Sequence, residues 1–215
     1  MVDTKTGADL MVGMTIGHYL PNLAQKVKKP FKIFSLVFII ITIVCGALAA
    51  NWQNFLDQGY KIFTMECNVT KEKACQSVIS QVLKKFGEID ILFNNAGITQ
   101  RGLFEKTNTS VFKKVMDVNF YGALYCTKAA LPSLIRTKGI IIVNESIAGV
   151  APLLGRTGYS ASKHALHGLF TSLRCELRYK GVHVMIVCPG FIRTNIQTRA
   201  LGGDGKIAIH YCMNI

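Results

Sequence analysis

A tyrosine and a lysine four positions apart, Tyr159 and Lys163, have the clearest capacity for proton transfer in this sequence. On a helix, residues at this spacing lie on the same face. Free tyrosine has a pKa of about 10, and a neighbouring ammonium group stabilises the phenolate and lowers that pKa. We therefore expect Tyr159 to exchange a proton with a substrate oxygen at neutral pH, assisted by Lys163.

A serine 13 positions before the tyrosine, Ser146, adds a hydroxyl that can hydrogen-bond the same substrate oxygen. A tyrosine acid/base with such a partner suits the interconversion of a carbonyl and a secondary alcohol. That reaction moves a hydride, which no side chain can supply, so the chemistry requires a cofactor.

The elements that must position these residues follow an alternating pattern. Short apolar runs predict strands, and longer segments of helical period predict helices between them. The expected strands are Lys61–Cys67, Ile89–Phe93, Ile140–Val143 and Val182–Cys188, and the expected helices are Lys71–Phe86, Thr109–Ile135 and Ser160–Tyr179. This alternation indicates parallel βαβ units, in which ligands bind beyond the carboxyl ends of the strands. Asn95, Ser146 and Gly190 all follow expected strands, so we look for the site there.

The chain divides into a basic segment at residues 1–32, an apolar segment at 33–50 and one α/β domain at 51–215. Ile33–Ala50 is a run of 18 residues without charge, at the lower limit for a membrane span. It can be a membrane anchor, a cleaved signal peptide or, at Phe34–Val44, a buried strand. We favour the anchor because lysines cluster at Lys26–Lys32, and therefore expect membrane association, with a cytoplasmic protein as the alternative.

Composition excludes several classes of protein. Half of the 215 residues are hydrophobic and 17% are charged, which excludes a disordered or low-complexity chain. The net charge of +13 is spread along the chain and accompanies no nucleic-acid-binding motif, so nucleic acid is not an expected partner. The seven cysteines include no CxxC motif, and His164, His167 and His183 show no ligand spacing. We expect no metal site.

Taken in order, these motifs resemble the short-chain dehydrogenase/reductase (SDR) family of the classical type. The pieces that carry the resemblance are Cys67-Asn68-Val69-Thr70, Asn94-Asn95-Ala96-Gly97, Asn119, Ser146, Tyr159-x-x-x-Lys163 and Pro189-Gly190 with Thr194. The resemblance implies a single Rossmann-like domain with a doubly wound parallel sheet, incomplete at both ends. It also implies NAD or NADP as cofactor and a small carbonyl or alcohol substrate, and it leaves a homo-oligomer open.

The resemblance further implies a role for each matching residue. Tyr159 is the expected acid/base, Ser146 orients the carbonyl, and Lys163 lowers the tyrosine pKa and holds the nicotinamide ribose. Asn119 is expected to kink its helix and to hold a water that links Lys163 to solvent. The expected cofactor contacts, besides Tyr159 and Lys163, are Asn68 and Val69 at the adenine, Asn95 near its ribose, and Ile192 and Thr194 at the carboxamide.

Three features depart from the family pattern. The Gly-rich turn TGxxxGxG, which brings the backbone close to the cofactor pyrophosphate, does not occur in this sequence. Asn68 stands where an acidic residue is frequent, and Glu145 stands where a small residue is common. Two functional interpretations follow: an NAD(P)-dependent oxidoreductase, or a membrane-attached SDR remnant with impaired catalysis and no cofactor binding.

Overall fold

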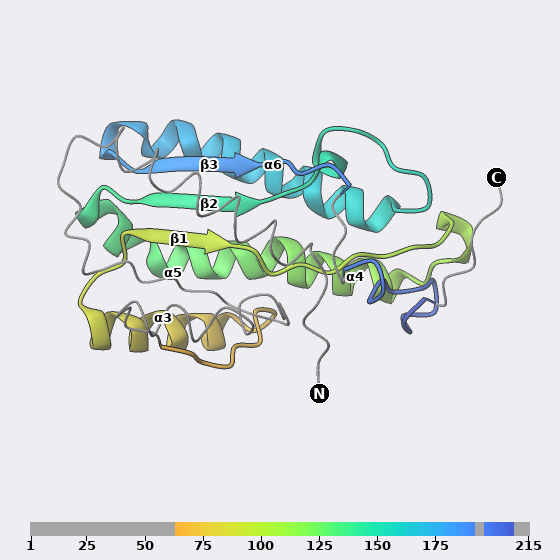
Figure 1. Cartoon of the computed structure of the whole chain (residues 1–215), viewed down its shortest axis with the longest axis horizontal. Helices are drawn as coiled ribbons and strands as arrows, with labels where there is room; N and C mark the ends of the chain where they lie inside the picture. Colours follow the sequence, from red (N-terminus) through yellow and green to blue (C-terminus); the bar gives the residue numbers. More distant parts are fainter. Residues whose placement is uncertain (1–62, 192–195, 209–215) are drawn as a thin grey trace, which may run out of the picture.

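The computed structural model describes residues 63–191 and 196–208. Within these residues, three strands form one parallel sheet in the order β1-β2-β3. Their bounds are Ile91–Asn94 (β1), Ile140–Asn144 (β2) and His183–Val187 (β3). The three arrows point the same way in Figure 1, so all three carboxyl ends lie at one edge of the sheet.

Helices connect the strands and pack along them (Figure 1). The four α-helices of the described residues are α3 (Glu72–Phe86), α4 (Thr109–Met116), α5 (Gly122–Thr137) and α6 (Thr157–Leu177). Helix α5 packs against α3 and β1, and α6 packs against α4 and β3. The units β1-α4-α5-β2 and β2-α6-β3 are therefore the βαβ units that the sequence predicts, and the Rossmann-like α/β fold is confirmed.

The core lies between the sheet and these helices. Leu92 and Ile141 at the centre of the sheet are fully buried, and Phe170 of α6 and Leu134 of α5 cover them from the helical layer. The apolar runs of β1 and β2 show no strict alternation of buried and exposed residues. Such continuous runs are typical of parallel strands inside an α/β domain.

Two expected elements differ in the structure. The expected strand Lys61–Cys67 has no ladder partner over its described residues 63–67. Phe63, Met65 and Cys67 nevertheless pack on the core, which explains the strand-like sequence pattern. The expected helix Thr109–Ile135 is interrupted by a π-helical turn at Asp117–Tyr121, which separates α4 from α5.

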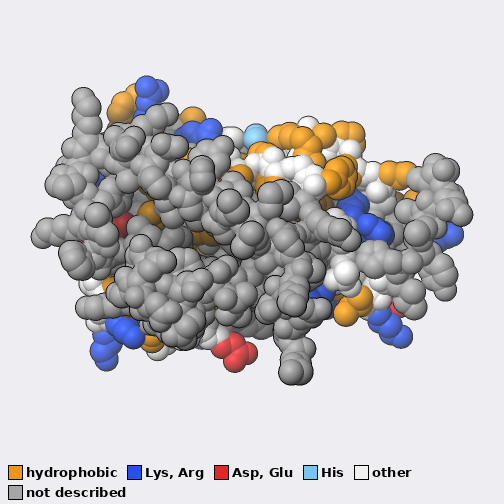
Figure 2. Space-filling model, in the orientation of Figure 1, with side chains coloured by type: hydrophobic (Ala, Val, Ile, Leu, Met, Phe, Trp, Pro, Cys, Tyr) orange, Lys and Arg blue, Asp and Glu red, His pale blue; other side chains and the backbone are white. Residues whose placement is uncertain are grey.

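The apolar segment Ile33–Ala50 lies outside the described residues, as do Ile192 and Thr194. Among the helices that the structure does describe, none combines the length and apolarity needed to cross a bilayer. Among the described residues, Figure 2 shows Lys and Arg side chains at several separate places on the visible face.

Candidate active site

The carboxyl ends of the strands bring the expected site residues together. The side-chain amide of Asn144, at the end of β2, donates a hydrogen bond of 2.7 Å to Oδ1 of Asn95, in the loop after β1. Asn94, the last residue of β1, donates through Nδ2 to Oγ1 of Thr127 on α5. These bonds fix the loops that follow β1 and β2 relative to each other and to the helical layer.

The tyrosine and lysine lie on the inner side of α6. Tyr159 is 8% exposed and Lys163 is 4% exposed. The ammonium of Lys163 donates a hydrogen bond of 2.9 Å to the carbonyl oxygen of Asn144. Its Nζ lies 5.7 Å from the centre of the Tyr159 ring. The helix therefore presents both groups to the end of β2, as the spacing of four residues predicts.

Ser146 lies opposite the tyrosine. It precedes a 3-10 helix at Ile147–Gly149, and its hydroxyl oxygen accepts a hydrogen bond of 3.2 Å from the backbone N–H of Ala148. The Ser146 side chain also hydrogen-bonds with the Tyr159 hydroxyl, which opposes the rise that burial causes in the Tyr159 pKa. Two hydroxyl groups from different elements thus lie close together.

Asn119 ties three parts of the site together from the π-helical turn. This side chain is 1% exposed. Its Oδ1 accepts a hydrogen bond of 2.8 Å from the N–H of Ile98, and its Nδ2 donates to the Ile98 carbonyl at 3.0 Å and to Ser162 Oγ at 2.8 Å. The loop after β1 is thereby held against α6. Asn119 lies within the π-helical turn that separates α4 from α5.

Gly97 lies between the asparagine and the lysine. A β-carbon added at Gly97 would be 3.5 Å from Oδ1 of Asn119 and 3.9 Å from Nζ of Lys163. The backbone after β1 therefore passes closely over both functional side chains. The structure brings Asn119, Ser146, Tyr159 and Lys163 close together.

The pKa values of the site depend mainly on burial. Burial raises the pKa of Tyr159, while Ser146 and the guanidinium of Arg156 oppose that rise. Burial also lowers the pKa of Lys163 to about 8, against the opposing influence of Glu145 and Cys188. Arg156 is therefore a cation that opposes the rise of the Tyr159 pKa. The influence of Lys163 on that pKa stays a prediction.

Arg156 is a residue that the sequence analysis did not single out. It is 8% exposed, and its Nη1 donates to Thr99 Oγ1 at 2.7 Å. Its Nη2 donates to Oε1 of Gln197, also at 2.7 Å. The arginine thus joins the first turn of α6 to the loop after β1 and to the segment after Gly190. Its position three residues before Tyr159 was the available signal, because that spacing places both residues on one side of a helix.

The expected adenine contacts lie in a separate turn before α3. Oδ1 of Asn68 accepts hydrogen bonds from the N–H and the hydroxyl of Thr70, at 3.1 and 2.8 Å. The Val69 side chain is buried against Gly122 of α5, where an added β-carbon would be 2.9 Å from Val69 Cγ2. Asn68 and Val69 therefore have evident local roles in turn and core.

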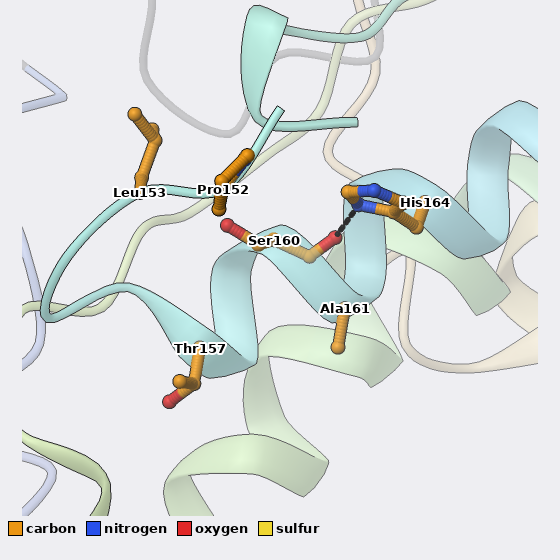
Figure 3. A pocket seen from close by; sticks show the side chains of 6 residues that line it. All are labelled: Pro152, Leu153, Thr157, Ser160, Ala161 and His164. Carbon is orange, nitrogen blue, oxygen red and sulfur yellow. Dashed lines mark hydrogen bonds between the residues drawn. The ribbon is translucent and has the colours of Figure 1, made fainter. Parts of the chain in front are cut away.

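A hollow of about 370 Å³ lies beside the first turns of α6. Figure 3 shows the side chains that line it. Its lining includes Thr157, Ser160 and His164, and Nδ1 of His164 lies 2.9 Å from the Ser160 carbonyl oxygen. These residues form a different stripe of the helix from Tyr159 and Lys163. We therefore do not assign the hollow to the site.

Comparison with known proteins agrees with the fold. A model of the short-chain dehydrogenases matches residues 37–202. The chain therefore belongs to the short-chain dehydrogenase family.

Particular relatives are also similar. Dehydrogenase/reductase SDR family member 7B from Danio rerio is 38% identical over 145 residues, covering 65% of this chain and 47% of that protein. Dehydrogenase/reductase SDR family member 7 from Homo sapiens is 39% identical over 145 residues, covering 66% of this chain and 43% of that protein. The chain spans less than half the length of these two relatives.

Two solved structures share the fold. A short-chain dehydrogenase/reductase from Burkholderia phymatum in complex with NAD has a TM-score of 0.66 and 27% identity, covering 71% of this chain and 56% of that one. An alcohol dehydrogenase from Thermococcus sibiricus complexed with 5-hydroxy-NADP has a TM-score of 0.65 and 25% identity, covering 77% and 67%.

Proposed function

We propose that the protein is an NAD(P)-dependent oxidoreductase that interconverts a carbonyl and a secondary alcohol. The observation that carries the proposal is the convergence of the Ser146 and Tyr159 side chains beside the buried ammonium of Lys163. In the direction of reduction, Tyr159 donates its phenolic proton to the carbonyl oxygen, and Ser146 hydrogen-bonds the same oxygen. In oxidation, the phenolate of Tyr159 takes the hydroxyl proton.

The residues present fit the nicotinamide end of such a cofactor. Lys163 Nζ has three N–H donors, and within the described residues it donates a hydrogen bond to the carbonyl of Asn144. The remaining donors suit the two hydroxyls of a ribose. When bound, the dinucleotide would supply or accept the hydride. Asn95, held by Asn144, lies in the loop where the resemblance expects the adenosine ribose.

The electrostatics of the site support this assignment of roles. The buried phenol resists ionisation, because burial disfavours its charged form. Arg156 and Ser146 favour the phenolate, and they do so from fixed positions. The site therefore stores the proton on Tyr159 until a polar substrate oxygen arrives, which suits a general acid for carbonyl reduction.

The test is the replacement of the phenol. Tyr159→Phe removes the proton and keeps the ring, so we expect turnover of a carbonyl panel with NADH or NADPH to fall by about 10²–10⁴-fold. Tyr179→Phe, at an exposed tyrosine beyond α6, is the matched control and should leave turnover unchanged. Equal turnover in wild type and Tyr159→Phe would refute the role of Tyr159.

The absence of TGxxxGxG from the sequence favours the second candidate function, a remnant that binds no cofactor. In that case the site residues would keep their positions without catalysing a reaction, and Tyr159→Phe would have no activity to abolish. Titration with cofactor separates the two functions.

Membrane association through Ile33–Ala50 remains part of the proposal. The family match begins at residue 37, inside that run, and this supports the competing interpretation as a strand of the domain. Alkaline carbonate extraction of the full chain separates them. An anchored protein stays with the membrane pellet, and a protein released into the supernatant contradicts the anchor.

A further inference from the structure

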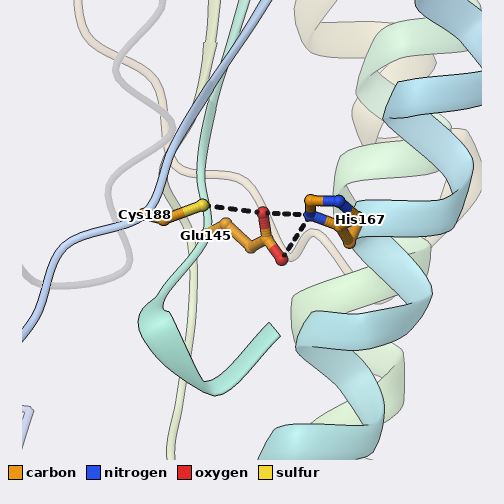
Figure 4. A group of neighbouring side chains, drawn as sticks. All are labelled: Glu145, His167 and Cys188. Atoms are coloured by element: carbon orange, nitrogen blue, oxygen red, sulfur yellow. Dashed lines mark hydrogen bonds and ion pairs between the residues drawn. The ribbon is translucent and has the colours of Figure 1, made fainter. Parts of the chain in front are cut away.

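Three side chains with donor atoms suited to a transition metal lie close together just beyond the carboxyl ends of β2 and β3 (Figure 4). Nδ1 of His167 lies 3.1 Å from Oε2 of Glu145, and Sγ of Cys188 lies 3.2 Å from the same oxygen. The three donor atoms all lie within 4.8 Å of one another. We call these three residues the Glu-His-Cys cluster.

Three separate elements hold the cluster in place. Asn144 pairs with Val187 in the register of β2 and β3, so Glu145 and Cys188 are the next residues along the two strands. The N–H of Glu145 donates to the Val187 carbonyl at 2.9 Å, which extends that pairing by one step. His167 comes from α6, which packs against β3. The geometry of the cluster is therefore set by the pairing of β2 with β3 and by the packing of α6 on β3.

The backbone beside the Glu145 carboxylate leaves room for it at Gly149. A β-carbon added at Gly149 would collide with the carboxyl group of Glu145, so the glycine leaves room that the carboxylate occupies. The Glu145 side chain is fully buried. The His167 side chain is 39% exposed, and Cys188 is also exposed. The cluster is thus anchored on its inner side and open on its outer side, where an ion can enter.

The donor set selects among ions. Imidazole nitrogen, thiolate sulfur and carboxylate oxygen together suit Zn²⁺, whereas Ca²⁺ and Mg²⁺ require oxygen ligands. Tetrahedral zinc with bonds of about 2.0–2.3 Å places neighbouring ligand atoms about 3.3–3.5 Å apart. The observed separations of 3.1 and 3.2 Å from Glu145 Oε2 are already close to this spacing. One thiolate and one carboxylate also neutralise the charge of the ion.

We propose that Glu145, His167 and Cys188 bind one Zn²⁺ ion, with water at the fourth position. On binding, the S–H bond of Cys188 breaks, a Zn–S bond forms and the proton passes to solvent. His167 binds through the lone pair on Nδ1 and carries its hydrogen on Nε2. The test of this site measures metal binding alone, so its outcome does not depend on the proposed oxidoreductase activity.

Cobalt titration of the full chain tests the site. Co²⁺ takes the place of Zn²⁺ and gives a near-ultraviolet charge-transfer band only when a thiolate coordinates it. We expect the band to saturate at one Co²⁺ per chain and to disappear when Zn²⁺ is added. Cys188→Ser should abolish the band. His167→Gln should weaken cobalt binding by at least about 100-fold, since even outer-shell changes cost 10–100-fold.

Matched controls lie on the same helix. Cys175→Ser removes an exposed free thiol of α6, and His164→Gln removes a histidine one turn before His167. Both variants should keep the wild-type cobalt band and affinity. Circular dichroism of every variant confirms that it folds, and both tested residues of the cluster are partly exposed, so their replacement spares the core. A missing band in the wild type, or a band that survives Cys188→Ser, would overturn the proposal.

Discussion

Replacement of Lys163 by methionine tests the electrostatics of the site through protein stability. Burial lowers the pKa of this ammonium from 10.5 to about 8. One pKa unit corresponds to about 1.4 kcal/mol, so the full effect on the free energy of unfolding is about 3 kcal/mol. Below pH 8 both the folded and the unfolded chain hold the proton. Between pH 8 and 10.5 only the unfolded chain holds it, so stability rises with pH in this window.

Urea unfolding at pH 7.5 and pH 10 measures the effect. Wild type should gain about 2 kcal/mol relative to Lys163→Met between these two pH values, because most of the titration window lies between them. The loss of the hydrogen bond to the Asn144 carbonyl is a constant offset and cancels in the comparison. Lys128→Met, at an exposed position of α5, should show no such pH dependence. A wild-type advantage that stays flat or falls with pH would refute the reasoning.

Three further variants test the supports of the site. Asn119→Ala removes three hydrogen bonds and leaves both backbone groups of Ile98 unpaired, so urea unfolding should show a loss of about 2–4 kcal/mol. Gly149→Ala should cost about 1–3 kcal/mol in the same assay, because the new methyl group meets the Glu145 carboxyl. Its control, Gly168→Ala, adds a methyl group to open space within α6 and should instead stabilise the chain by about 0.5–1 kcal/mol. Phe170→Ala leaves a cavity in the core and should cost about 3–5 kcal/mol, measured by the urea midpoint.

The sequence predicts the parts of the site that depend on local periodicity. The apolar runs locate β1, β2 and β3 to within two residues, and the spacing of four places Tyr159 and Lys163 on one face of α6. Polar residues after strands correctly mark the edge where Asn95 and Asn144 meet. These features are predictable because each depends on residues close together in the chain.

Contacts between segments that are far apart in the chain could not be predicted from the sequence. Glu145 and His167 are 22 positions apart, and Glu145 and Cys188 are 43 apart, so no ligand spacing links them. The direction of the Lys163 ammonium, toward the carbonyl of Asn144, depends on how α6 packs on the sheet. The segment Lys61–Cys67 has the alternation of a strand, but a strand also requires a neighbour with which to pair.

The most direct test of the central claim is a cofactor titration of the full chain, followed by nicotinamide fluorescence of NADH and NADPH. If Lys163 and its neighbours form a working nicotinamide site, binding saturates in the micromolar range, as is usual for enzyme ligands. Lys163→Met should then weaken binding, and Lys128→Met should leave it unchanged. Fluorescence that shows no saturable binding for either cofactor up to millimolar concentration would contradict the account.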